Sequence, residues 1–321
     1  MILVFMVVIF SFTLNAKIKF QVEVYGGYGS FSPNDLNMYS SHLKKWIPFS
    51  YYDRFKYWGK NGWVKDISFS QKGNFAIIKN IFPFGGRLRV HISKNFSISL
   101  GVERFSKTSA SSPMFNGSYT DNYKKYENLY YERYKLFSGG IYPNLSTHYK
   151  HKLIDWNSKA IEFEAYAGLG LVFGKCIVDE KYDEIYIRPD LKQNVTIAHK
   201  MEGSGKKIGA HAGLRLNINL SHKIGFFLGG EYFHGGKEEI SGETTFEYNM
   251  KTEYDGKEEN FHYIEKWKGI WFIEEFDWLK DWGEFHYARP ENDPDNIDWK
   301  SRYFYFDPSG FRFLLGIFYR I

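Results

Sequence analysis

Alternation of apolar and polar residues is clearest between Gly86 and Glu103. Arg87, Arg89 and Glu103 fall on one face of an extended chain, and a set of apolar residues falls on the other. The apolar positions are Leu88, Val90, Ile92, Phe96, Ile98, Leu100 and Val102. Because successive side chains of a strand point to opposite faces, the stretch predicts two strands joined by a tight turn at Lys94-Asn95, with one apolar face and one charged face.

Six further segments alternate with the same period of two. They are 17–28, 136–149, 161–174, 208–220, 224–232 and 311–321. With the two strands of the hairpin, they predict eight strands. Long polar connections at about 30–84, 107–134, 178–205 and 234–308 separate some of these segments, and short turns separate the others.

The connections alternate strictly between long and short. In an antiparallel up-and-down barrel this order places every short turn at one rim and every long loop at the other, an asymmetry typical of outer-membrane barrels. The segments are also long enough to cross a bilayer as tilted strands. A soluble barrel, with its apolar residues inside, gives no reason for the sorting of the loops. We therefore predict an all-β transmembrane barrel whose apolar face contacts lipid.

Two details of this barrel are open at the level of sequence. Phe69, Thr196 and Thr245 lie in connecting segments that would raise the strand count from eight to ten if they were extended. The first connection contains Ser32-Pro33-Asn34-Asp35, a typical helix start. Apolar residues at helical spacing follow it, so we expect a short amphipathic helix that runs to Trp46.

Composition agrees with this fold and excludes several others. The chain has 321 residues, of which 20% are aromatic, as the aromatic girdles of an outer-membrane barrel require. A mean hydropathy of −0.44 argues against a bundle of membrane helices. The net charge of +5 is spread out without a basic block, so we expect no nucleic-acid partner. The single cysteine, Cys176, excludes an internal disulfide.

The first residues differ from the rest of the chain. Ile2 to Leu14 form a nearly continuous apolar run that is shorter than a membrane-spanning helix requires and ends before Ala16. We interpret 1–16 as a secretory signal peptide that is cleaved on export, although its start lacks Lys and Arg. Residues 17–321 would then form the barrel domain, located in a bacterial outer membrane.

The last segment carries the most specific pattern. Phe313, Leu315, Ile317 and Tyr319 alternate up to the end of the chain. In this the chain resembles the small eight-stranded outer-membrane β-barrel family typified by the transmembrane domain of outer-membrane protein A. The resemblance implies that barrel-insertion machinery reads the C-terminal strand. Ile321 stands where the family pattern has a final Phe, which weakens this signal.

The charged residues on the predicted inner face are of both signs. An eight-stranded barrel is just wide enough for its side chains to fill it, and unpaired charges there would be costly. We therefore expect a barrel-interior charge network, with Arg320 as a further member. The nine residues assigned to it are Glu23, Arg87, Arg89, Glu103, Glu162, Glu164, Arg215, Glu231 and Arg312. A conducting pore is the alternative.

Other chemistry has weaker support. The acidic segment 291–298 offers oxygen ligands for Ca²⁺ without a recognisable ligand spacing, and the aromatic stretch 264–282 suggests either a ligand-facing cap or a strand extension. His91 with Ser93, and His234 beside two glycines, are the only hints of a lipid-modifying enzyme. We assign no catalytic residue, no metal site and no cofactor.

The sequence thus predicts a monomeric outer-membrane barrel with a structural or surface-interaction role. Its expected partners are the lipid bilayer, the outer-membrane lipids and the insertion machinery. A narrow channel is the first alternative, and a lipid-modifying enzyme is the second.

Overall fold

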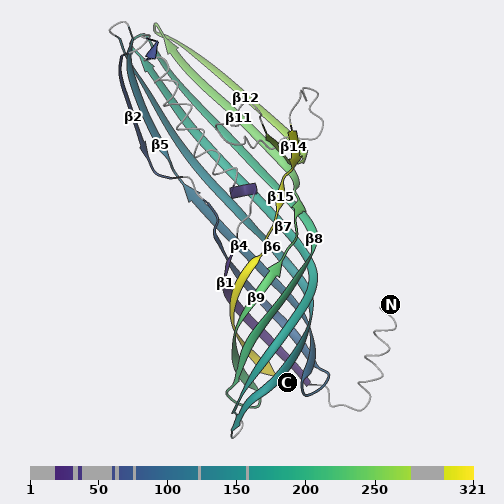
Figure 1. Ribbon diagram of the computed structural model, residues 1–321. Coiled ribbons are helices and arrows are strands. Elements are labelled where there is room, and N and C mark those ends of the chain that lie inside the picture. Colours follow the sequence, from purple (N-terminus) through teal and green to yellow (C-terminus); the bar gives the residue numbers. More distant parts are fainter. Residues whose placement is uncertain are drawn as a thin grey trace.

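The fold was analysed in a computed structural model, which describes residues 19–31, 35–37, 60–61, 65–74, 77–121, 124–156, 159–275 and 300–321. These residues are almost entirely antiparallel β-structure, so the predicted all-β class is confirmed (Figure 1). The strands in the largest sheet are β1 (Lys19–Ser30), β2 (Lys65–Lys72), β3 (Asn80–His91), β4 (Phe96–Ser111), β5 (Met114–Asp121), β6 (Lys124–Trp156), β7 (Lys159–Arg188), β8 (Leu191–Asn219), β9 (Ile224–His234), β11 (Ser241–Tyr254), β12 (Lys257–Ile270) and β16 (Gly310–Arg320).

The predicted hairpin is present. β3 pairs with β4 from Phe82 opposite Ser106 to His91 opposite Ser97, and residues 92–95 form the turn. The hydroxyl of Ser93 accepts hydrogen bonds from the backbone N–H groups of Asn95 and Phe96, which fixes the turn locally. Ile92 therefore belongs to the turn and not to the strand.

Eight strands pair in a closed ring. β1 pairs with β3, and the pairing continues through β4, β6, β7, β8, β9 and β16 back to β1. Each of these strands is therefore paired along both sides within the ring, and no edge is left there. Figure 1 shows the ring in the lower half of the molecule, where the C-terminus lies at the same end as the short turns.

The ring is staggered, which means that its strands are tilted. The stagger can be measured by starting at Gly26 and stepping from each residue to the one paired with it on the next strand. Stepping in the two directions around the ring leads to two residues of β8 that are ten positions apart. The first path is Gly26, Phe84, Arg104, Ile141, Phe173 and Lys206; the second is Gly26, Leu315, Leu228 and Leu216. A fixed stagger of this kind couples the tilt to the number of strands.

The two faces of the ring have opposite character. Leu100 is 65% exposed on the outer face, whereas Arg89 is 1% exposed on the inner face. Leu88, Phe96 and Val102 are also exposed, while Val90, Ile92 and Ile98 are half-buried. The apolar residues of the hairpin thus lie on the outside of the ring, as their alternation predicts.

The connections differ most from expectation. Much of 107–134, 178–205 and 234–308 was predicted as loop, and this was wrong. β5 and β6 cover most of the first range, β7 and β8 cover the second apart from the turn at 189–190, and β11 and β12 lie in the third. Beyond the ring they form one sheet in the order β2-β5-β6-β7-β8-β11-β12 (Figure 1). We call this part the extension sheet. Its polar residues occur on both faces, so the alternation that marks a one-sided strand is absent.

Smaller elements lie where the ring meets the extension sheet. β10 (Glu238–Glu239) pairs with β15 (Tyr305–Phe306), and β13 (Phe272–Glu275) pairs with β14 (Lys300–Tyr303). Of the expected helix to Trp46, only 35–37 is described, and it is helical. The Asn37 amide donates to the backbone oxygen of Ile78 and accepts from its N–H, which ties this turn to the segment just before β3. The expected signal peptide lies outside the described residues.

Within the described residues, no helix is long and apolar enough to span a bilayer.

Candidate functional site

The inner face of the ring carries all nine acidic and basic residues that the sequence assigned to an interior network. They come from seven strands, and the most exposed of them, Glu162, is only 6% exposed. The strands place them there by alternation, since each is flanked by residues of the outer face. The structure therefore brings the nine residues together in one enclosed space.

The centre of the network is a four-membered group. Arg89 lies 2.8 Å from both Glu23 and Glu164, measured from its Nη2 and Nη1 atoms. Arg215 bridges the same two carboxylates, at 2.7 Å from Glu23 and 3.0 Å from Glu164. Two arginines and two glutamates thus alternate around a closed circuit, and each charge has two partners of opposite sign.

A second group lies closer to the extension sheet. Arg312 forms ion pairs with Glu103 and Glu231, and Arg87 lies 3.4 Å from Glu231. The Arg87 guanidinium also lies 4.7 Å from the centre of the Tyr25 ring, a cation–π distance. Arginine suits this position because its planar, multiply donating head can serve several acceptors at once.

The third group lies near the short turns. Glu162 receives Lys150 at 3.2 Å and Arg320 at 3.1 Å. Arg320 therefore lies in this group as a partner of Glu162. Lys150 was missed, because the segment 136–149 ended one residue before it. The position of Lys150 on the polar face of β6 was the signal that could have found it.

An aromatic cluster fills the ring above these ion pairs. Phe105, Tyr142 and Phe233 project inward at the junction with the extension sheet, with ring centres 5.9 Å apart for Phe105–Phe233 and 4.9 Å for Tyr142–Phe233. Trp271, Phe304 and Phe306 belong to the same buried cluster. The described interior is thus filled by ion pairs at one level and by aromatic rings at the next.

The structure also assembles a Ser–His–Glu chain that the sequence did not reveal. Ser99 Oγ lies 2.8 Å from His148 Nε2, and His148 Nδ1 lies 2.7 Å from Glu164. These distances match a nucleophilic triad. The three side chains are buried, however, and Glu164 is also held by Arg89 and Arg215. A nucleophile needs room for a substrate carbonyl beside it, so we interpret the chain as part of the packed network.

The two histidine hints from the sequence do not form catalytic arrangements. His91 Nε2 lies 3.2 Å from the Gln21 amide oxygen, and Ser93 is used by the turn. His234 does have a serine neighbour, since its Nδ1 lies 3.3 Å from Ser309 Oγ. The Ser309 hydroxyl donates to Asp307 at 2.5 Å, so its proton is directed away from the histidine.

A separate carboxyl pair is buried in the extension sheet. Glu132 on β6 accepts a hydrogen bond from the Tyr130 hydroxyl at 3.3 Å and lies beside Glu180 on β7. Burial, and after it the neighbouring Glu180 charge, together raise the pKa of the Glu132 carboxyl to about 9. Glu132 is therefore protonated at neutral pH. Sequence analysis missed this pair because it assigned the segment to a loop.

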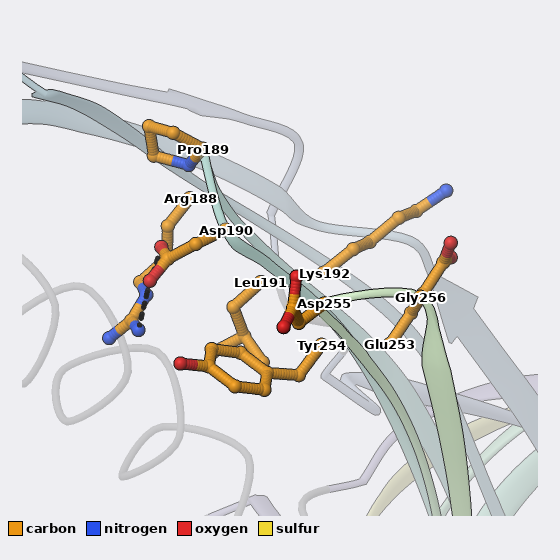
Figure 2. Close-up of a pocket in the computed structure, with 9 residues that line it drawn as sticks. All are labelled: Arg188, Pro189, Asp190, Leu191, Lys192, Glu253, Tyr254, Asp255 and Gly256. Carbon is orange, nitrogen blue, oxygen red and sulfur yellow. Dashed lines mark hydrogen bonds and ion pairs between the residues drawn. The ribbon is translucent and has the colours of Figure 1, made fainter.

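An open pocket of about 650 Å³ lies at the far end of the extension sheet, between the β7–β8 and β11–β12 turns (Figure 2). Arg188 donates to both oxygens of Asp190 at 3.1 and 3.0 Å. Figure 2 shows the Tyr254 ring beside Leu191 at the centre of this pocket. The Arg188 guanidinium is held by Asp190 on the same turn, and we assign no ligand to this pocket.

No group of three or more His, Cys, Asp or Glu side chains is placed to hold a metal ion within the described ranges. The candidate Ca²⁺ segment 291–298 lies outside those ranges, as do residues 276–282 of the aromatic stretch 264–282. The first half of that stretch is part of β12, which agrees with the strand-extension interpretation.

Comparison with known proteins gives no family. No family model matches the chain, and no curated protein matches it.

Proposed function

We propose that the ring is an up-and-down β-barrel that crosses a bacterial outer membrane and carries the extension sheet on the cell surface, where it has a structural or surface-interaction role. The observation that carries this proposal is the inverted polarity of the ring. Its outer face is apolar and exposed, and its inner face is charged and buried. In water such an arrangement would expose much of the apolar surface that folding normally removes from solvent.

The height of the apolar face supports a bilayer crossing. Along β16 and the residue that follows it, every second residue from Phe311 to Ile321 is exposed on the outer face, a span of ten residues. At about 3.3 Å per residue and a tilt of about 40°, this distance is roughly 25 Å along the axis of the ring. An outer-membrane barrel has an apolar band of about this height.

Aromatic residues border the band at both ends. Phe20, Tyr149 and Tyr319 are exposed near the short turns. Near the extension sheet, Tyr28 contacts Phe82 and Tyr232 contacts Phe311, with ring centres 5.6 and 5.0 Å apart. Amphipathic rings are favoured at both membrane–water interfaces, so these residues fit two girdles.

The contents of the ring favour an anchor over the two alternatives. Ion pairs and aromatic side chains occupy the path that a channel would need to keep open. The Ser99–His148–Glu164 chain faces this packed interior and not the lipid side. We therefore rank the channel and the lipid-modifying enzyme below the anchor.

The extension sheet supplies a surface for interactions. β12 is exposed along nearly its whole length, and among the described strands it pairs only with β11. Phe261, Tyr263 and Ile264 are exposed on it. Exposed strand edges and apolar side chains are common features of interaction surfaces.

Refolding into detergent and then into lipid vesicles tests the proposal. An intact barrel should migrate differently on a gel before and after boiling, and added protease should shorten the chain only to a protected ring fragment. Vesicles should show no ion conductance. A chain that partitions with outer membranes but shows neither a heat-dependent shift nor a protected fragment would contradict the barrel. Regular single-channel currents that change in Glu162→Gln would favour the channel instead.

A further inference from the structure

The outer wall of the molecule has a hollow directly above the apolar band. Its volume is about 630 Å³, and it lies on β7, β8, β11 and β12 where the ring passes into the extension sheet. Two rows of outward residues form it. The lower row is Lys175, Ser204, Ser241 and Ile270, and the upper row includes Glu202, Glu243 and Lys268. The two serines are small, which leaves the space between Lys175 and Ile270 open.

The charges around the hollow are arranged in pairs. Lys175 forms an ion pair with Glu202, and Lys268 lies 3.4 Å from Glu243. Lys206 lies one outward position below Ser204 on β8 and opposite Phe173. It is therefore a diagonal neighbour of Lys175, within the reach of long side chains. Lys175 and Lys206 thus present two ammonium groups at the lower lip of the hollow.

Lysines also mark the height of this lip around the ring. The stagger of ten residues over eight strands corresponds to about 1.25 residues per strand. When the height of each residue along the ring axis is corrected for this stagger, six lysines lie at nearly the same height. Their heights differ by no more than about two residues, and they lie roughly 10 Å beyond Tyr28. They are Lys79, Lys107, Lys175, Lys206, Lys207 and Lys237. Asp307 also lies at this level and accepts hydrogen bonds from Ser309.

Apolar side chains continue directly below the hollow. Leu171, Phe173 and Ile208 are exposed on the outer face of β7 and β8, and Leu171 is paired opposite Ile208. From the apolar band upward, the wall therefore presents an apolar strip, then two lysines, then a hollow lined by hydroxyl and carboxylate groups. This order matches a lipid whose acyl chains are attached to a phosphorylated sugar, because the phosphates and the sugar hydroxyls then lie together above the acyl chains.

We propose that this hollow binds the headgroup of a phosphorylated glycolipid in the outer leaflet. Lys175 and Lys206 contact the phosphate, Ser204 and Ser241 contact the sugar hydroxyls, and an acyl chain lies along Phe173 and Ile208. The proposal rests on the proposed function, because only a ring embedded in the membrane brings a lipid to this height. Lysine is a common phosphate-binding residue, and each basic residue near an anionic membrane surface contributes to lipid attraction.

Binding can be measured by native mass spectrometry of the refolded full chain in detergent micelles. The probes are diphosphorylated lipid A, its form without phosphates, and inorganic phosphate as a competitor. We expect wild-type protein to bind lipid A, and to bind the form without phosphates much more weakly. Excess free phosphate should not displace the bound lipid A. Displacement by free phosphate would show a simple anion site and overturn the assignment to a lipid.

Two pairs of substitutions separate a defined site from general attraction. Lys175→Gln with Lys206→Gln should weaken lipid A binding by roughly thirtyfold, from the attraction expected of two lysines. Lys79→Gln with Lys107→Gln removes the same charge at the same height elsewhere on the ring and should change binding less than twofold. Equal losses in the two variants, or no loss in the first, would overturn the proposal.

Ser204→Leu tests the hollow without changing any charge. The larger side chain should occupy the space between Lys175 and Ile270 and reduce lipid A binding to the level of the lysine pair variant. Unchanged binding would overturn the proposal. Each variant is first checked for the heat-dependent gel shift. Absence of the shift in the wild type would contradict the barrel itself, whereas a normal shift with unaltered binding would contradict only the glycolipid site.

Discussion

The ring and the extension sheet share three continuous strands, but the outer face of the ring is apolar and that of the extension sheet is largely polar. Along β7, the part inside the ring has exposed Leu169 and Leu171 outside and buried Glu162 and Glu164 inside. Farther along, in the extension sheet, the outward positions from 175 to 181 are Lys175, Ile177, Asp179 and Lys181, three of which are charged. The same strand therefore changes the character of its outer face near Lys175, although its hydrogen bonding continues unbroken.

The boundary between the ring and the extension sheet is therefore set by the side chains of the strand and not by a break in its backbone pairing. Inside the ring, pairing of buried charges is obligatory, since an isolated ion in such a space is very costly. In the extension sheet, water is available to exposed charges, and their pairs matter little to stability. Substitutions of the same kind should therefore have very different effects in the two regions.

The largest effect is expected for Arg215→Leu. This change leaves Glu23 and Glu164 with one guanidinium instead of two in a buried space. Removal of one partner from a buried ion group typically costs about 3–5 kcal/mol, so the urea midpoint of the vesicle-folded protein should fall sharply. Replacing Glu164 as well, in an Arg215→Leu, Glu164→Gln variant, should restore part of the loss. An unchanged midpoint in the single variant would contradict an energetically coupled network.

Leu100→Arg should have the next largest effect. Leu100 is 65% exposed near the middle of the proposed lipid-facing band, where an arginine costs about 2–4 kcal/mol in a transmembrane barrel. The matched change is Ile264→Arg on the exposed surface of β12, which should leave the midpoint nearly unchanged. Both midpoints are read by urea titration in lipid vesicles. Equal tolerance of the two arginines would remove the distinction between the two regions.

Glu132→Gln should alter the pH dependence of the extension sheet alone. The folded pKa of Glu132, about 9, lies above its unfolded value. Its contribution to stability is therefore fully present at acidic pH and is lost as the pH rises toward and through 9. Limited proteolysis of the wild type should become several-fold faster between pH 6 and pH 9.5, and the neutral Gln should flatten this rise. A parallel rise in the variant would assign the pH dependence to other groups.

The smallest effect is expected for Arg133→Ala. Arg133 lies 3.4 Å from Asp183 on the exposed surface of the extension sheet, and exposed ion pairs contribute about 0–1 kcal/mol. Its urea midpoint should match the wild type within error, in contrast to Arg215→Leu. A loss as large as that of Arg215→Leu would show that exposure does not separate the two classes of ion pair.

Sequence reasoning worked where one face of a strand is apolar and the other is not. The hairpin, the inner position of Arg87 and Glu103 and the short turns all follow from a period of two. The strands of the extension sheet were not predicted, because Tyr, Lys, Ser and Glu alternate there without a clear apolar face. Long-range partners were not predicted either: nothing local to Ser99 or His148 reveals that β4 and β6 bring them to 2.8 Å.

The most direct test of the central proposal compares the surroundings of two outward residues in lipid vesicles, one on the ring and one on the extension sheet. Cys176, the single cysteine, is replaced by serine, and nitroxide labels are attached to Leu100→Cys and, separately, Ile264→Cys in lipid vesicles. Electron paramagnetic resonance then compares relaxation by oxygen, which concentrates in lipid, with relaxation by a water-soluble nickel chelate. We expect position 100 to respond to oxygen and position 264 to nickel. A label at position 100 as accessible to nickel as that at 264 would contradict a lipid-facing ring.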